Sequence, residues 1–314
     1  EFEHSLAGRM DGVATRRMVR FTDPESLRTL ALRSDMTVQV GRIAATGMAA
    51  APRPLRLCYA GDIALLSADQ LDPARQRLQV GAELIGTDSV AAASEMVSVA
   101  IAALKAAGVA NISVDFTLPD LVDTLAEDTL PLDAERRAAV RRELDTKDAG
   151  GLRDAGGEAY LPLLYATGPF DQAIDTLAEI DVDGALGSRI TGLREIAATI
   201  GDRARVTLDP TERHGFEYQS WFGFTLYGEG ARGALGRGGT YTIKGSDEPA
   251  TGFSLYMDPL LDALGGPEAD EREILFLPLG HDREVGARLR AIGWRTVAAV
   301  SDSDDAGALG CSHV

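Results

Sequence analysis

Hydrophobic and polar residues alternate along two segments in the first third of the chain, and this alternation predicts β-strands. The segments are Leu55–Gly61 and Gln76–Leu84, and the polar stretch Asp62–Arg75 between them predicts the long loop of a hairpin. Two shorter β-type runs, Met18–Thr22 and Thr29–Arg33, flank an Asp-Pro-Glu-Ser sequence that is typical of a turn. We therefore expect a second, shorter hairpin near the start of the chain.

Helical patterns separate and follow these strands. The Ala- and Ile-rich run Val38–Met48 predicts a partly buried helix, which the prolines after it terminate. A longer apolar helix is expected to begin at Asp88 or Ser89, either of which can cap it, and to end at Gly108. Residues 119–200 are mainly helical in pattern, and DAERRAAVRRELDTKD is their clearest amphipathic segment.

Strand patterns lie on both sides of this helical region. Short apolar runs predict strands at Ile112–Leu118, Val206–Leu208, Phe222–Leu226 and Tyr241–Ile243, and a helix-like run follows at Leu255–Leu264. The last part of the sequence predicts one β-α-β unit, formed by Ile274–Leu279, Asp282–Ile292 and Thr296–Val300. Strands interrupted by helices and then resumed predict an α+β core with a helical insertion.

Composition narrows the classes of function. The chain has 314 residues, 45% of them hydrophobic, and a formal net charge of −17. Such a charge disfavours non-specific binding to nucleic acid or to an anionic membrane. Two cysteines and no long apolar run indicate a cytoplasmic protein with neither a disulfide framework nor a membrane span. The chain begins with Glu1 rather than Met, so we expect a segment before it.

Motifs that could carry chemistry are weak. The glycine-rich piece 233–241 lacks the Lys-Ser/Thr of a phosphate loop, and a turn between strands is the better interpretation. The acidic stretch 301–307 lacks the glutamate that a calcium loop needs. The four histidines show no metal-ligand spacing, and Cys58 is expected to be a buried thiol rather than a nucleophile. We predict no metal, no cofactor and no catalytic residue from these patterns.

Several segments nevertheless resemble, in order, the catalytic domain of histidyl-tRNA synthetase, a class II synthetase. Its Leu-Arg-Pro-Glu-x-Thr segment is similar to LALRSDMTVQVGRIA (30–44). Its motif 2 is similar to PLRLCYAGDI (54–63) together with RQRLQVGAELIG (75–86), and its histidine-binding segment is similar to HGFEYQSWFGFTLY (214–227). GRGGTY (236–241) and ATGFSLYMDPLLDAL (250–264) resemble its glycine strand and motif 3. The resemblance implies a class II synthetase-like core, mainly an antiparallel sheet flanked by helices.

The sequence departs from a working synthetase at the positions that hold ATP. The resemblance places the motif 2 arginine at Leu65 and the motif 3 arginine at Pro259, while Tyr256 replaces a small residue next to the adenine. Adenylation builds negative charge on the α-phosphate, and neither leucine nor proline opposes it. About 44 residues follow Asp270, too few for the anticodon-binding domain of such enzymes. We therefore expect a non-catalytic chain.

One non-catalytic branch of this family resembles the chain more closely than any synthetase does. Four segments carry this resemblance: GFEY, EPATGFSLYMD (248–258), LDTKDAGGL (144–152) and ALGCSHV (308–314). That branch is the regulatory subunit of ATP phosphoribosyltransferase, which acts in histidine biosynthesis. Membership implies a homodimer within a hetero-octamer that contains the short-form catalytic subunit. It also implies histidine as an effector. We expect a core at 1–270, with the helical insertion at 119–200, and a β-α-β segment at 271–314.

The resemblance also implies an amino-acid pocket. The residues that hold the ligand's amino group fall on Asp35, Thr37, Gln79 and Glu83. Tyr218 matches an aromatic wall residue and Gln219 stands where a tyrosine is common, whereas His214 replaces an arginine that approaches the ligand carboxylate.

Each residue of this pocket also has a structural interpretation. Asp35 and Thr37 can cap the following helix, and Glu83 can pair with Arg75 or Arg77. Two other functions stay open from the sequence, a divergent amino-acid-adenylating ligase and a free-standing amino-acid sensor.

Overall fold

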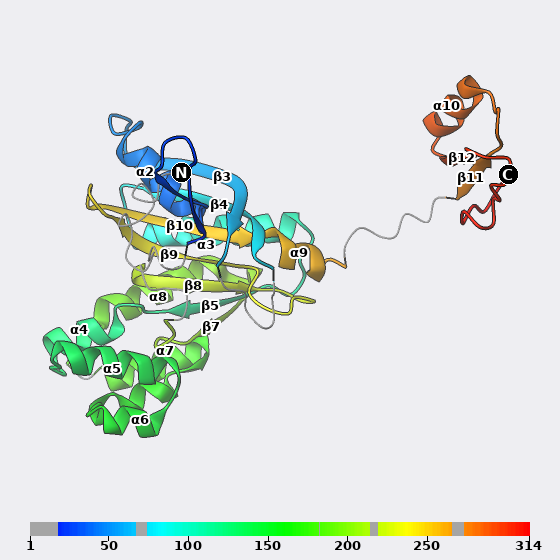
Figure 1. Cartoon of the computed structure of the whole chain (residues 1–314). Helices are drawn as coiled ribbons and strands as arrows, with labels where there is room; N and C mark the ends of the chain where they lie inside the picture. Colours follow the sequence, from blue (N-terminus) through cyan, green and yellow to red (C-terminus); the bar gives the residue numbers. More distant parts are fainter. Residues whose placement is uncertain (1–17, 67–73, 182, 214–218, 266–272) are drawn as a thin grey trace. The chain divides into compact units, whose positions relative to one another are not determined.

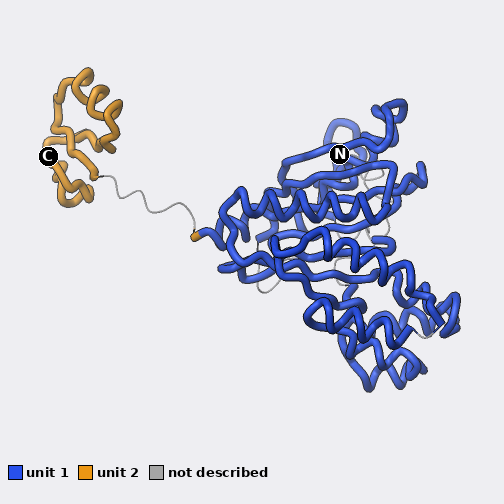
Figure 2. The backbone as a smooth tube through the Cα atoms, turned by 180° about the vertical axis from the view of Figure 1, so that it is seen from behind, with its two compact units in different colours: residues 1–264 blue, residues 265–314 orange. Residues whose placement is uncertain are grey.

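The computed structural model describes the chain except residues 1–17, 67–73, 182, 214–218 and 266–272 (Figure 1). Its contacts divide the chain into two compact units, residues 1–264 and residues 265–314 (Figure 2). The first unit contains the large sheet and the candidate site. None of the described helices is long and apolar enough to cross a membrane.

An eight-stranded sheet organises the first unit. Its strand order is β3-β4-β10-β9-β8-β5-β7-β6, and every neighbouring pair is antiparallel except β5 and β7. The strands are β3 (Leu55–Ala64), β4 (Gln76–Ile85), β5 (Ser113–Thr117), β6 (Gly168–Pro169), β7 (Arg205–Leu208), β8 (Gln219–Tyr227), β9 (Gly236–Ile243) and β10 (Glu248–Tyr256). The β3–β4 hairpin and the mainly antiparallel α+β core are confirmed.

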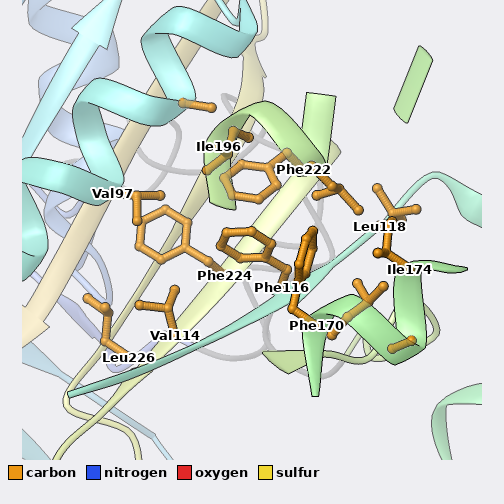
Figure 3. Packing of buried hydrophobic residues seen from close by; sticks show 14 of the residues in the cluster. Val97, Val114, Phe116, Leu118, Phe170, Ile174, Ile196, Phe222, Phe224 and Leu226 are labelled. Atoms are coloured by element: carbon orange, nitrogen blue, oxygen red, sulfur yellow. The ribbon is translucent and has the colours of Figure 1, made fainter. Parts of the chain in front are cut away.

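The main hydrophobic core lies between one face of this sheet and two helices, α3 (Val90–Ala106) and α8 (Gly187–Ile200). Three fully buried rings form its centre: Phe116 meets Phe222 edge to face with centroids 5.2 Å apart, and Phe224 stacks on Phe222 at 5.7 Å (Figure 3). The α3 helix begins where predicted, because the Ser89 side chain accepts a hydrogen bond from the amide of Ala92.

The opposite face of the sheet is covered in part by α2 (Met36–Ala45). Two apolar clusters hold this helix, one around Val38, Ala44 and Tyr241, the other around Met36 and Tyr59. The short hairpin of β1 (Arg20–Thr22) and β2 (Thr29–Ala31) precedes the helix, as the turn sequence predicted. Polar residues near the start of α2 lie between the two apolar clusters and form the candidate site.

The insertion between β5 and β7 is helical, as predicted. Figure 1 shows it in green, gathered at the end of the sheet that carries these two strands. It contains α4 (Leu121–Asp128), α5 (Ala134–Asp145), α6 (Ala149–Asp154), the 3₁₀ segment η2 (Glu158–Tyr165), the short strand β6 and α7 (Phe170–Ile180), followed by α8 and the 3₁₀ turn η3 (Gly201–Arg203).

Two sequence predictions are wrong. The composition-based prediction of a turn at 233–241 is wrong from Gly236 onward, where the chain forms strand β9, as the resemblance of GRGGTY to a glycine strand implied. Glycine is required in this strand, since a Cβ on Gly238 would lie 2.4 Å from the Phe224 ring. Cys58 is exposed, because its alternating strand β3 lies at the edge of the sheet and turns this side chain outward. In addition, Leu255 and Tyr256 end strand β10, so the helix α9 (Met257–Ala263) is shorter than the predicted helical run.

The second unit contains the predicted β-α-β motif. Its strands β11 (Ile274–Leu277) and β12 (Arg295–Ala298) pair in parallel, and α10 (Arg283–Ala291) connects them. The helix begins at Asp282, whose carboxylate accepts hydrogen bonds from the amides of Glu284 and Val285.

Candidate functional site

Four of the predicted site residues meet at the start of α2. Asp35 is the N-cap of this helix and Thr37 lies in its first turn. Gln79 and Glu83 are four residues apart on β4, so their side chains leave the same face of the sheet. Gln79, Glu83 and Thr37 are all more than 95% buried. The fold thus brings together polar groups from two segments that are 44 to 46 positions apart in sequence.

Glu83 is held by two hydroxyl groups. Thr37 donates from Oγ1 to Glu83 Oε1 at 2.9 Å, and Tyr241 donates from its phenol to Glu83 Oε2 at 2.8 Å. No arginine forms an ion pair with Glu83 among the residues that the structure describes, so the predicted alternative of pairing with Arg75 or Arg77 is wrong.

Gln79 links the helix to the sheet. Its Nε2 donates to Asp35 Oδ1 at 3.1 Å and to Ser254 Oγ at 2.6 Å, and its Oε1 accepts from the amide of Met36 at 2.9 Å. Asp35 also accepts from the amide of Thr37 at 2.9 Å, so its predicted capping role is confirmed and it still faces the polar cluster. Both donors of the Gln79 side-chain amide and one acceptor position of its oxygen are therefore used within the described cluster.

Tyr59 completes the network from β3. Its hydroxyl lies 3.2 Å from Thr37 Oγ1 and 2.8 Å from Ser254 Oγ. Sequence reasoning did not find Tyr59, Tyr241 or Ser254. The strand register brings Tyr59 and Ser254 together, since it places both opposite Gly81, and this register is known only from the folded sheet.

Glycines provide the space in which these side chains lie. Across the sheet, Glu83, Gly252, Gly239 and Gly223 are direct neighbours on β4, β10, β9 and β8. A Cβ on Gly252 would lie 1.7 Å from Glu83 Oε2, and one on Gly239 would lie 2.5 Å from Gln219 Oε1. Glu83 and Gln219 therefore lie over adjacent glycines.

Gln219 is thereby placed on the same face of the sheet as Glu83, one strand further along. Its Oε1 is buried and has no hydrogen-bond partner in the part of the chain that the structure describes. The other two predicted pocket residues, His214 and Tyr218, lie outside the described residues.

Burial determines the electrostatics of the described part of the site. Burial raises the pKa of Glu83 from 4.5 to about 8, although the hydrogen bonds from Tyr241 and Thr37 act in the opposite direction. Burial likewise raises the pKa of Asp35, and it raises the pKa of Tyr59 well above its ordinary value, with the carboxylates of Glu83 and Asp35 adding to the effect. A group that carried positive charge into this cluster would favour the ionised carboxylates.

Comparison with known proteins assigns the chain to a family. A family model described as histidyl-tRNA synthetase matches residues 1–260. An ATP phosphoribosyltransferase regulatory subunit from Rhodospirillum centenum is 40% identical over all of this chain and 83% of that protein. The chain belongs to the ATP phosphoribosyltransferase regulatory subunit family. A second member, from Paramagnetospirillum magneticum, is 39% identical over all of this chain and 84% of its own length.

Solved structures agree on the fold of this family member. A regulatory subunit/histidyl-tRNA synthetase from Bacillus halodurans has a TM-score of 0.81 at 24% identity and covers 99% of this chain and 84% of that chain. A chain of the ATP phosphoribosyl transferase (HisG:HisZ) complex from Thermotoga maritima has a TM-score of 0.57 at 17% identity, with 76% of this chain and 85% of that chain covered. The predicted class II synthetase-like fold is confirmed.

In this family member, the positions that the resemblance assigned to ATP are apolar or aromatic. Leu65 and Tyr256 are partly buried against the apolar cluster that contains Met36 and Tyr59. The guanidinium of Arg77 lies 5.7 Å from the centre of the Tyr256 ring. Pro259 lies in the first turn of α9.

Proposed function

We propose that this chain is the non-catalytic regulatory subunit of an ATP phosphoribosyltransferase. In this proposal it assembles with a short-form catalytic subunit, as a homodimer within a hetero-octamer, raises the catalytic subunit's activity and supports feedback by histidine. The names of relatives at 40% and 39% identity over the full chain support the assignment. An activator of this kind must bind the active state of its partner more tightly than the inactive state.

We propose that the chain does not catalyse adenylation, because it lacks arginine at the two positions where the resemblance places the arginines of a synthetase. Leu65 packs into an apolar cluster, and Pro259 offers neither a charge nor a hydrogen-bond donor. Arg33, a cation that contacts β3 near Leu65, donates to the carbonyl of Asp62 at 2.6 Å and to Gln39 at 3.2 Å, so its guanidinium already binds within the protein. Catalysis of adenylation relies on fixed positive charge at the α-phosphate.

The single observation that carries an effector role is the buried polar cluster around Glu83 and Asp35. All hydrogen bonds that these two carboxyl groups receive from described residues come from neutral donors, namely the Thr37 and Tyr241 hydroxyls, the Thr37 amide and the Gln79 amide. The α-ammonium group of an amino acid would supply the missing positive charge through charge-assisted hydrogen bonds. We therefore propose histidine as the ligand of Asp35, Thr37, Gln79 and Glu83, with Gln219 beside it and His214 and Tyr218 completing the pocket.

Formation of phosphoribosyl-ATP by the short-form catalytic subunit from the same organism tests this function. We expect a large rise in rate when the chain is added and a fall when histidine follows. Substituting Thr37→Val should reduce the effect of histidine and leave the activation, whereas Thr37→Ser should retain both because it keeps the hydroxyl.

Three outcomes would contradict the proposal or part of it. Unchanged catalytic rates at saturating chain concentration would exclude the regulatory role. Histidine binding without any effect on phosphoribosyl transfer would favour the sensor. Amino-acid-dependent exchange between ATP and pyrophosphate would favour the ligase.

A further inference from the structure

An amino acid carries a carboxylate as well as an ammonium group, and both are bonded to the same carbon atom. The residues at the start of α2 suit the ammonium group, because they offer carboxyl, hydroxyl and amide oxygens. Asp35 and Glu83 would repel the carboxylate of the same ligand unless a cation lay close to it. The resemblance places that cation at residue 214, where this chain has a histidine.

The strand register places an arginine, Arg237, beside this cluster. Arg237 of β9 lies directly opposite Ser254 of β10. The Ser254 hydroxyl belongs to the cluster, since its Oγ lies 2.6 Å from Gln79 Nε2 and 2.8 Å from the Tyr59 hydroxyl. Directly opposite residues leave the same face of a sheet, with Cβ atoms about 4.5–5.5 Å apart. The Arg237 side chain therefore starts next to a member of the cluster.

A glycine occupies the sheet position between Arg237 and Glu83. Gly252 is directly opposite Glu83 on one side and Gly239 on the other, so Arg237 and Gly252 are diagonal neighbours. Diagonal neighbours are about 7–8 Å apart, a distance that a long side chain spans. Gly252 has no side chain that would separate the guanidinium from the Glu83 carboxyl group. The sheet thus lets one small ligand contact both groups.

The charge of Arg237 acts on the same surface as the carboxyl group of Asp35. Burial raises the pKa of Tyr256 and the charge of Asp35 adds to this effect, whereas the charges of Arg237 and Arg77 act in the opposite direction. Tyr256 is therefore within electrostatic range of Asp35 and of Arg237. An ammonium group at Asp35 and a carboxylate at Arg237 would form two charge-assisted interactions in one site.

Two acids lie on the other side of Arg237. Burial and the charges of Asp115 and Asp209 raise the pKa of Glu212, and Arg237 opposes this rise without reversing it. Asp115 is two strands away from Arg237, beyond Thr225, and burial raises its pKa as well. A carboxyl group in a strong ion pair has a lowered pKa instead. Neither acid therefore takes the place of an anionic ligand at Arg237.

Two other arginines near the cluster are placed differently. Arg33 donates to the carbonyl of Asp62 at 2.6 Å. The guanidinium of Arg77 lies 5.7 Å from the centre of the Tyr256 ring, over its face. Of these three arginines, Arg237 is the one that lies directly opposite a residue of the cluster.

We propose that Arg237 binds the α-carboxylate of the amino acid whose ammonium group lies at Asp35 and Glu83. Its planar guanidinium can donate two hydrogen bonds to the two carboxylate oxygens. Arg237 then performs the role that the resemblance assigns to an arginine at residue 214. The site selects a zwitterion, because it recognises both charges of the ligand. This inference rests on the proposed function, which supplies the amino acid.

Isothermal titration calorimetry of the full chain with three probes tests this proposal, at a pH where the α-amino group of each probe is protonated. Histidine has both charged groups, histamine lacks the carboxylate, and histidine methyl ester replaces it by a neutral ester. We expect the unmodified chain to bind histidine about ten- to a hundredfold more tightly than either other probe, the range of a hydrogen bond between charged groups. Arg237→Gln should weaken histidine binding by this factor and leave histamine binding unchanged.

Two further variants separate the carboxylate contact from other effects. Arg77→Gln is the matched control, because it removes an arginine from the same region of the sheet, and it should keep the preference for histidine. Arg237→Lys keeps the charge but loses the planar fork, so it should keep part of the preference. Unchanged histidine binding by Arg237→Gln would overturn the proposal. Equal weakening of histidine and histamine would also overturn it, because it would show a purely structural role.

The unmodified chain provides a test that does not depend on the folding of any variant. A tenfold preference for histidine over its methyl ester supports a cationic carboxylate site, and equal affinities overturn the proposal. If the unmodified chain binds none of the three probes, the proposed amino-acid site fails first, and this inference fails with it. Normal histidine binding by a folded Arg237→Gln variant overturns only the role of Arg237 and leaves the proposed function intact.

Discussion

Replacing Glu83 by glutamine should change how the stability of this chain depends on pH. The pKa of Glu83 is raised from 4.5 to about 8 in the folded chain by burial. Between these two values the folded state holds a proton that the unfolded state has released. The free energy of unfolding therefore falls as pH rises through this interval. Glutamine is neutral throughout, so Glu83→Gln removes this contribution.

The size of the effect follows from the interval. One pH unit corresponds to about 1.4 kcal/mol of proton-binding free energy. Because Glu83 is 1% exposed, solvent does not screen it, and the full interval corresponds to roughly 4–5 kcal/mol as an upper value. Near pH 5, glutamine replaces a neutral carboxyl group, and the Thr37 and Tyr241 hydroxyls can rotate to meet it. We expect the two proteins to be similarly stable there.

Urea unfolding at fixed protein concentration, at several pH values from 5 to 9, measures this difference. The variant should gain stability relative to the unmodified chain by several kcal/mol as pH rises. Glu95→Gln is the matched control, because the hydrogen bond from Arg56 lowers the pKa of Glu95, so this carboxyl group is ionised in the folded state from pH 5 to 9 and its replacement should give a nearly pH-independent difference over this range. Parallel stability curves for Glu83→Gln and the unmodified chain would refute the reasoning, since they would show that Glu83 is ionised throughout.

Two further substitutions test the packing of the site. Gly252→Ala should displace the Glu83 carboxylate, because the added Cβ would lie 1.7 Å from Oε2. We expect urea unfolding to show a loss of roughly 1–3 kcal/mol. Gly233→Ala is the control, because a Cβ there meets open space, and this variant should unfold as the unmodified chain does. Equal midpoints for the two glycine variants would contradict the close contact. Tyr241→Phe removes one of the two hydrogen-bond donors to Glu83. We expect it to lower the free energy of unfolding by about 1–2 kcal/mol above pH 8, where the carboxylate is ionised, and by less at pH 5. A loss of stability that does not vary with pH would show that the phenol acts through packing instead.

The sequence predicted the parts of the fold that depend on local patterns. Alternation located β3 and β4, and the serine before α3 is the cap that its position suggested. The four residues around the start of α2 came from resemblance to a family rather than from any pattern in the chain. Their spacing in sequence, with Asp35 and Glu83 forty-eight positions apart, does not indicate contact without the fold.

Other features could not be predicted because they depend on tertiary contacts. Glycine favours turns, so composition alone predicts a turn at 233–241, and only the family resemblance indicated strand β9. The Phe224 ring packed against Gly238 explains why glycine is required there. Alternation along β3 separates two faces but does not say which is buried, and this is why the exposure of Cys58 was missed. The role of Tyr241 depends on the positions of β9, β10 and β4 side by side in the sheet.

The stability predictions bear on why the polar cluster is present at all. A buried carboxyl group without a cation lowers stability at neutral pH, and an apolar or neutral replacement that fits is often neutral or stabilising. If Glu83→Gln is more stable at pH 8 and also loses its response to histidine, then stability cannot be the reason for a glutamate at this position. Binding of an ammonium group would then be the reason, because its charge offsets the cost of burying the ionised carboxylate. If the variant keeps the full histidine response, the effector acts elsewhere in the complex and the cluster serves only the fold.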